Sequence, residues 1–111
     1  EKSETALIKA LSDKYPEIQA GAATALGTLR SHKAVEILIS ALDINSRIRC
    51  EAIDALGEIR TAKAVPHLIR ILKNETKNSD IYIKTQISLK KILKNLRMEN
   101  KILNPLFGNL E

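Results

Sequence analysis

The stretch that decides the fold is Ile48-Arg49-Cys50-Glu51-Ala52-Ile53-Asp54-Ala55-Leu56-Gly57-Glu58-Ile59-Arg60. Thirty residues earlier the chain reads Ile18-Gln19-Ala20-Gly21-Ala22-Ala23-Thr24-Ala25-Leu26-Gly27-Thr28-Leu29-Arg30, and both stretches carry Ala-Leu-Gly at the same place. A sequence that repeats at this period is typical of stacked two-helix units, because one such unit cannot bury its apolar face alone. The repeat predicts an all-α fold in which successive helical hairpins stack.

Helical spacing of apolar residues extends this pattern along the chain. Pro16 and Pro66 fall in predicted first turns, where a missing backbone N–H is tolerated, and Ser31 can cap the third helix. Together they predict one domain, an α-α superhelix of three hairpins (repeats 3–30, 31–60 and 61–97) with an apolar tail over 98–111. We expect helices over roughly residues 3–13, 16–29, 31–42, 48–60, 61–72 and 80–96.

One face of each second helix carries the predicted core. Gly27 and Gly57 lie inside these helices, where glycine costs ~1 kcal/mol relative to alanine. We expect both glycines to let paired helices approach closely. The predicted core positions are Ile18, Ala22, Ala25, Leu26 and Leu29 in one helix and Ile48, Ala52, Ala55, Leu56 and Ile59 in the other.

Both end units depart from the repeat. Ser88-Leu89-Lys90 replaces Ala-Leu-Gly in the last helix, and the first helix has Glu4 and Ala6 where the second unit has Val35 and Ile37. Terminal units of a stack are often atypical, because one side faces water. We therefore expect both ends to be caps and the solenoid to be nearly complete at three repeats. The last helix should expose a basic stripe of Lys90, Lys91, Lys94, Arg97 and Lys101.

The net charge of +5 is unevenly distributed. Residues 1–59 have a net charge of −2 and residues 60–101 a net charge of +8. The basic half is typical of a protein that binds an acidic partner or nucleic acid. The single Cys50 cannot form an intramolecular disulfide, so nothing points to an oxidising compartment and we expect a cytoplasmic protein. No apolar run approaches ~18 residues, so no membrane-spanning helix is expected.

The residues at these repeated positions resemble the HEAT-like repeat, in the short form of phycobilisome-lyase-type proteins. The resemblance rests on Ala34-Val35, Leu38-Ile39, Ala41-Leu42-Asp43, Ile48-Arg49 and Ala55-Leu56-Gly57, and it covers residues 4 to about 96. It implies a right-handed helical solenoid of three hairpins and says little about function. It also implies an ion pair between Asp43, which ends a first helix, and Arg49, which opens a second.

No catalytic residue, cofactor site or metal site is predicted. His32 and His67 have no second ligand at metal-binding spacing, and no His or basic group is placed to activate Cys50. The carboxylates Glu51, Asp54 and Glu58 share a helix face, where a solvated surface explains them better than acid–base chemistry does. We therefore expect a non-enzyme.

The non-core positions of the second helices should line a concave groove that binds a protein partner. A partner with a basic segment beside an apolar one would suit a groove that runs from neutral through acidic to apolar and basic. Ile83 and Ile87 are large apolar residues off the core face, as at contact sites. The candidate residues are Thr24, Thr28, Cys50, Glu51, Asp54, Glu58, Ile83, Lys84, Ile87 and Lys91.

Two other functions stay open. The basic half could bind nucleic acid, although the chain lacks aromatic platforms for stacking bases. By resemblance alone, the chain could be a subunit or fragment of a lyase-type enzyme that handles a tetrapyrrole. The apolar tail should be buried, either on the last hairpin or through association with another chain or domain.

Overall fold

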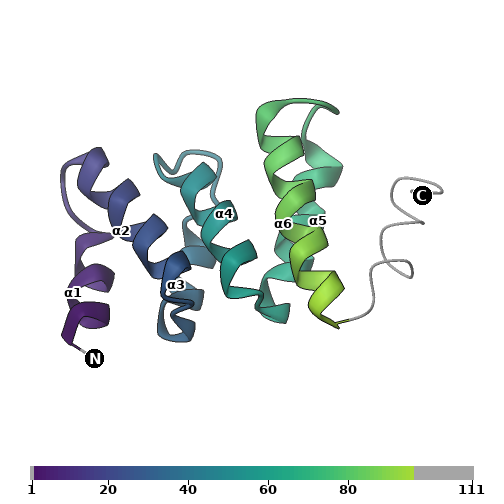
Figure 1. Ribbon diagram of the computed structural model, residues 1–111. Helices are drawn as coiled ribbons and strands as arrows, with labels where there is room; N and C mark the ends of the chain where they lie inside the picture. The colour runs from purple at the N-terminus through teal and green to yellow at the C-terminus, as the bar shows by residue number, and fades with distance from the viewer. Residues whose placement is uncertain (1, 97–111) are drawn as a thin grey trace.

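The computed structural model describes residues 2–96, and the structural statements below concern that part of the chain. These residues form helices and turns only, in three successive hairpins (Figure 1). The predicted tail and two residues of the predicted basic stripe, Arg97 and Lys101, lie outside the described residues. The elements are α1 (Lys2–Ala10), α2 (Pro16–Thr28), the 3₁₀ turn η1 (His32–Ala34), α3 (Val35–Ser40), α4 (Arg49–Ile59), the 3₁₀ turn η2 (Ala62–Ala64), α5 (Val65–Asn74) and α6 (Asp80–Leu96).

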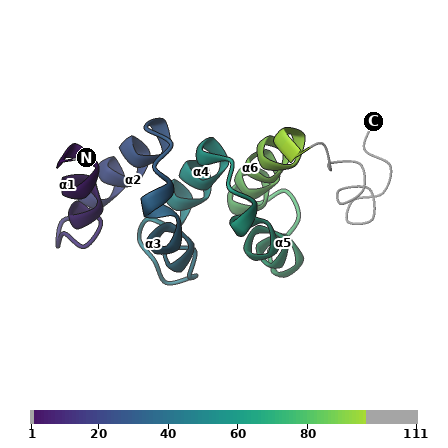
Figure 2. The ribbon, with the colours of Figure 1, turned by 90° about the horizontal axis from the view of Figure 1, so that it is seen from below.

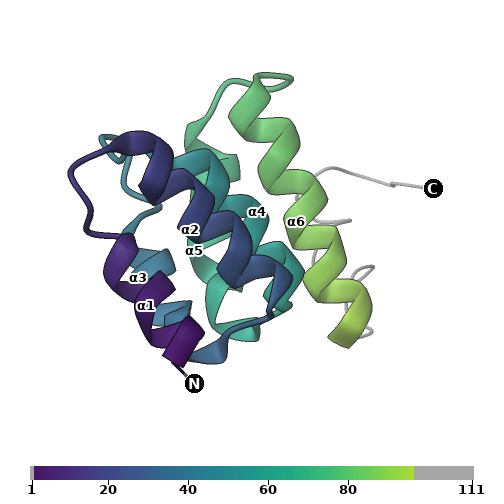
Figure 3. The ribbon, with the colours of Figure 1, turned by 60° about the vertical axis from the view of Figure 1, so that its left-hand side comes forward.

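The hairpins stack through their second helices. Within each hairpin the two helices pack together, α1 on α2, α3 on α4 and α5 on α6. Between hairpins, α4 packs against both α2 and α6, so these three form one layer (Figure 2). Figure 3 shows the same three helices as neighbours across one face of the molecule. The predicted helical-repeat solenoid is therefore confirmed.

The helix boundaries follow from local chemistry. Pro16 is the first residue of α2 and Pro66 lies in the first turn of α5, where neither N–H would have an intrahelical partner. Arg30 and Arg60 adopt the left-handed conformation, with φ of 54° and 63°, and end α2 and α4. After α2 the N–H groups of Arg30 and Ser31 donate to the carbonyls of Gly27 and Leu26, respectively. These hydrogen bonds give partners to carbonyl groups in the last turn of the helix.

The predicted cap at Ser31 has a different role. Ser31 precedes η1, but its side chain caps no backbone N–H, and its Oγ donates to a carboxylate oxygen of Glu4 in the first hairpin. Thr61, at the equivalent position before η2, does cap, because its Oγ1 accepts from the N–H of Lys63 at 3.3 Å. One serine thus joins two hairpins instead of starting a helix.

Gly27 and Gly57 stand where the second helices cross. A Cβ on Gly27 would lie 2.8 Å from Cα of Ala55, and a Cβ on Gly57 would lie 2.9 Å from Cα of Ser88. Both distances are shorter than real Cβ atoms show, so only glycine allows these backbones to approach so closely. The expected packing role of both glycines is confirmed, and the close approach is between consecutive hairpins.

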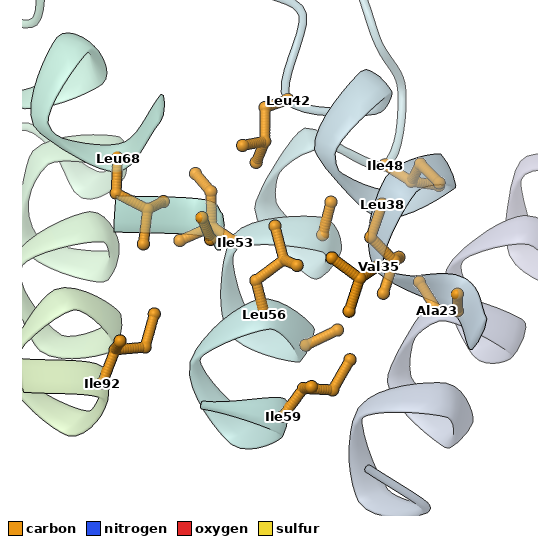
Figure 4. Packing of buried hydrophobic residues seen from close by; sticks show 14 of the residues in the cluster. Ala23, Val35, Leu38, Leu42, Ile48, Ile53, Leu56, Ile59, Leu68 and Ile92 are labelled. Atoms are coloured by element: carbon orange, nitrogen blue, oxygen red, sulfur yellow. The ribbon is translucent and has the colours of Figure 1, made fainter. Parts of the chain in front are cut away.

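α4 is buried on two sides, which a single predicted core face missed. Ile53 was not predicted to be buried, yet it is fully buried and points toward Leu68 of the third hairpin (Figure 4). Leu56 is also fully buried and lies on the side of Val35, in its own hairpin (Figure 4). A helix in the middle of a stack has neighbours before and after it, so its core is wider than one amphipathic stripe.

The predicted core is wrong at two positions of α2. Ile18 and Leu29 are exposed, although their equivalents Ile48 and Ile59 in α4 are buried. The physical reason is their position in the stack, because α4 has a hairpin before it and α2 has none in the described chain. This face is thus apolar and exposed, whereas the expected N-terminal cap stays a prediction.

Candidate functional site

A cleft of about 430 Å³ crosses the layer of second helices and receives residues from all three. Its lining includes Gly27, Ala55 and Ser88, the residues at which the helices approach most closely. A shallow valley forms there because the side chains at the crossings are small. The full lining is Thr24, Gly27, Thr28, Asp54, Ala55, Glu58, Ile87, Ser88 and Lys91.

Six of the ten predicted groove residues line this cleft. They are Thr24, Thr28, Asp54, Glu58, Ile87 and Lys91. The other four predicted residues, Cys50, Glu51, Ile83 and Lys84, do not line it. Sequence reasoning missed Gly27, Ala55 and Ser88, although the two repeated Ala-Leu-Gly motifs were the signal that could have found them.

The acidic and basic side chains of the predicted groove pair with each other. Nζ of Lys91 donates to Oε2 of Glu58 at 2.6 Å, and Nζ of Lys84 donates to Oδ2 of Asp54 at 3.0 Å. Both pairs join α4 to α6. The sequence suggested an acidic region followed by a basic one on this face. The structure instead places two ion pairs there, each neutral overall and each bridging neighbouring helices.

These pairs shift the protonation of their members. The hydrogen bond and charge of Lys91 hold the pKa of Glu58 below its ordinary value. The hydrogen bond and charge of Asp54 raise the pKa of Lys84 above its ordinary value. Each shift favours the charged form, so both bridges are in place near neutral pH.

The same geometry corrects the predicted basic stripe of α6. Lys90 and Lys94 are exposed, whereas Lys91 lies at the cleft and binds Glu58. Lys91 is thus one residue from Lys90 but on a different face. The described part of the stripe therefore contains two exposed lysines and one lysine whose charge is neutralised by Glu58.

A family model for HEAT repeats matches residues 4–84, nearly three quarters of the chain. The chain belongs to the HEAT-repeat family. HEAT repeats generally serve as protein-interaction scaffolds and are typically non-catalytic. The match is to HEAT repeats in general, and the phycobilisome-lyase-type resemblance stays a prediction. A comparison with curated proteins finds no match.

In this HEAT chain the implied Asp43–Arg49 pair is replaced by a bridge between hairpins. Nε of Arg49 donates to the Leu42 carbonyl at 3.0 Å, and its Nη1 donates to Oε2 of Glu75 at 3.1 Å. Asp43 instead accepts the N–H of Asn45 at 2.9 Å, within its own turn. Arg49 therefore ties the end of α3 to the end of α5.

Cys50 lies in the first turn of α4 and is partly buried. Burial raises the pKa of its thiol, and the nearby charge of Glu51 raises it further. A raised pKa lowers the fraction of thiolate, which is the reactive form. The setting of this thiol therefore disfavours a nucleophilic role.

The two histidines belong to different hairpins. His32 is exposed in η1, whereas His67 lines a second cleft of about 310 Å³, between α3 and α5. Among residues 2–96 no three His, Cys, Asp or Glu side chains come together as metal ligands could. In the same range, no helix combines the length and apolar character needed to cross a membrane.

Proposed function

We propose that this chain is a non-catalytic HEAT scaffold that binds a protein partner in the cleft across α2, α4 and α6. The observation that carries the proposal is the cleft itself, which joins three hairpins and combines polar groups with an exposed apolar residue. Ile87 lies at this cleft with half its surface in water, although an isoleucine gains free energy from burial. A cytoplasmic location stays part of this proposal.

The ion pairs decide what kind of segment would suit the cleft. A basic segment would have to compete with Lys91 for Glu58 and with Lys84 for Asp54. A neutral segment would leave both bridges in place. We therefore favour a partner that places an apolar side chain on Ile87 and polar backbone groups beside Thr24 and Thr28, over the basic segment that the sequence suggested.

The nucleic-acid alternative has less support. Phosphate binding needs free cations, because affinity comes from the counterions that neutralisation releases. Lys84 and Lys91 already have carboxylate partners, which would have to give way to phosphate. The lyase-type alternative depends on the family resemblance alone and has no support from a particular side chain.

The test is affinity capture from lysate with the full chain and two matched variants. Ile87→Lys places a charge in the cleft, whereas Ile44→Lys makes the same change at an exposed residue of the α3–α4 turn. We expect a protein retained by the natural chain and by Ile44→Lys but lost with Ile87→Lys. A partner retained equally by all three chains would contradict binding at this cleft. Circular dichroism would confirm that both variants fold.

Fluorescence anisotropy with labelled duplex and single-stranded DNA tests the alternative. At about 50 mM and 200 mM salt we expect little binding to the natural chain. Binding that falls steeply with salt would instead mean that phosphates are neutralised. In that case Lys90→Gln and Lys94→Gln should weaken it, and the protein-scaffold proposal would lose its advantage.

A further inference from the structure

The outer face of α2 has the chemistry of a buried interface but lies in water. The three hairpins can be aligned position by position, with α4 thirty residues after α2 and α6 thirty-three residues after α4. Ile18 is 45% exposed and its equivalent Ile48 is 6% exposed. Leu29 is 56% exposed, whereas its equivalents Ile59 and Ile92 are 4% and 0% exposed. The residues in α2 are as apolar as those that the stack covers.

The covering element in the other hairpins is known from the structure. Ala55 of α4 lies against Gly27 of the preceding helix, and Ser88 of α6 lies against Gly57. Ala25 is the equivalent of Ala55, and it is only partly buried. The same interface therefore occurs twice within the described chain, between α2 and α4 and between α4 and α6. The outer face of α2 has the residues of one side of such an interface, without a helix packed against it.

We propose that the face of α2 formed by Ile18, Ala25 and Leu29 is a docking surface for the second helix of a further HEAT hairpin. That helix carries glycine opposite Ala25, as Gly27 stands opposite Ala55 and Gly57 opposite Ser88. Its apolar side chains cover Ile18 and Leu29 in the way that the first hairpin covers Ile48 and Ile59. The basis is continuity with the interfaces α2–α4 and α4–α6.

A second copy of this chain does not supply such a helix. The equivalent of Gly27 and Gly57 in α6 is Lys90, whose side chain would meet the backbone at the crossing. The equivalent of the buried Ala23 and Ile53 is Gln86, a polar residue. Both residues therefore disfavour head-to-tail stacking of copies through α6.

The last described helix lies far from the exposed face of α2. The described chain ends at Leu96, on the helix at the far end of the stack from α2 (Figure 1). No described helix other than those of the stack itself lies against this face, and continuity of the stack favours a further HEAT hairpin as its occupant.

An extended chain tests the proposal. Residues 31–61 are duplicated ahead of Glu1 in the full chain, which keeps the repeat register and places a copy of Gly57 opposite Ala25. The substitutions Ile48→Lys and Ile59→Lys in that copy make the new end polar. We expect one cooperative unfolding transition, a midpoint raised by at least ~5 °C, and at least tenfold slower amide exchange in α2.

The matched control is the same extended chain with Gly57→Arg in the added copy. The arginine cannot approach Ala25 as glycine does, so the gain in midpoint and in α2 protection should disappear. Equal gains in both chains, or a separate melting step for the added hairpin in both, would overturn the proposal.

Sedimentation velocity of the natural chain separates this occupant from self-association. We expect a monomer at micromolar concentrations. A dimer that is lost in Leu29→Lys and kept in Ile44→Lys would show that a second copy covers the face, and would overturn the proposal.

Discussion

The Cβ position of Gly57 lies 2.7 Å from Cβ of Ser88 and 2.6 Å from its Oγ. Ser88 in turn donates its Oγ hydrogen to the carbonyl of Ile53 at 2.8 Å, a buried hydrogen bond between hairpins. The second and third hairpins are thus joined where one residue has no side chain and the other binds backbone. The floor of the cleft and the stability of the stack depend on the same contact.

Alanine at the crossing glycines should destabilise the fold although it favours the helix. A Cβ at Gly27 or Gly57 would force the neighbouring backbone to move, and overpacking of this kind typically costs ~1–3 kcal/mol. The gain in helix propensity offsets ~1 kcal/mol of that cost. We expect Gly57→Ala and Gly27→Ala each to lower the free energy of unfolding by up to ~2 kcal/mol, measured by urea denaturation.

Gly21 provides the matched control for that experiment. It is exposed within α2, and a Cβ there would meet nothing within 4 Å. Gly21→Ala should therefore raise the free energy of unfolding by ~0.5–1 kcal/mol. Equal effects at Gly21 and Gly57 would contradict the close-approach account.

Loss of Arg49 should cost more than loss of an exposed cation. The Arg49 and Glu75 side chains are only 13% and 20% exposed, and Arg49 also binds the Leu42 carbonyl. Removing it leaves a partly buried carboxylate unpaired, so we expect Arg49→Ala to lower the free energy of unfolding by ~1–3 kcal/mol.

One further variant separates the two contacts of Arg49, and another serves as an exposed control. Gln19, at the equivalent place in α2, donates to the Leu11 carbonyl at 3.1 Å, so Arg49→Gln should keep the carbonyl bond and lose only the ion pair. Lys63→Ala removes a pair whose side chains are 71% and 74% exposed, and should cost less than ~0.5 kcal/mol. Thermal unfolding that ranks Lys63→Ala with Arg49→Ala would argue against the bridge between hairpins.

The pair Glu58–Lys91 should make stability depend on acid. The pKa of Glu58 is lower in the folded than in the unfolded chain, so the folded state binds its proton less readily. The stability from this pair is present above the unfolded-state pKa of about 4.3 and is lost as pH falls through the folded pKa. NMR titration of the Glu58 carboxyl should show a higher pKa in Lys91→Ala. An unchanged pKa in that variant would rule out Lys91 as the cause.

Cys50 should react slowly with thiol reagents in the folded chain. Burial and the charge of Glu51 raise the pKa of the thiol, so less thiolate is present near neutral pH than for a free cysteine. With a disulfide reagent at pH 7.5 we expect a rate several-fold below that of glutathione, and a normal rate in urea. A folded-state rate above that of glutathione would point to activation that the geometry does not show.

Part of the cleft could be predicted from sequence, because a repeat fixes which positions share a face. Thr24, Asp54 and Ile87 occupy equivalent positions in three helices, so one alignment placed them all near the same cleft. The pairing of Glu58 with Lys91 was beyond that reasoning. The two residues occupy equivalent positions of neighbouring helices, but an alignment gives no side-chain distances, and the stacking of α4 on α6 brings Nζ of Lys91 within 2.6 Å of Oε2 of Glu58.

The sequence by itself determined the all-helical repeat, its period, and the special role of Gly27 and Gly57, because these follow from local periodicity and from the cost of glycine inside a helix. Tertiary structure alone decided which apolar residues are covered. Ile18 and Ile48 are the same residue in the same local pattern, yet one is exposed and the other is buried. The difference is the presence of a preceding hairpin, because burial depends on neighbours in space and the pattern of one helix does not record them.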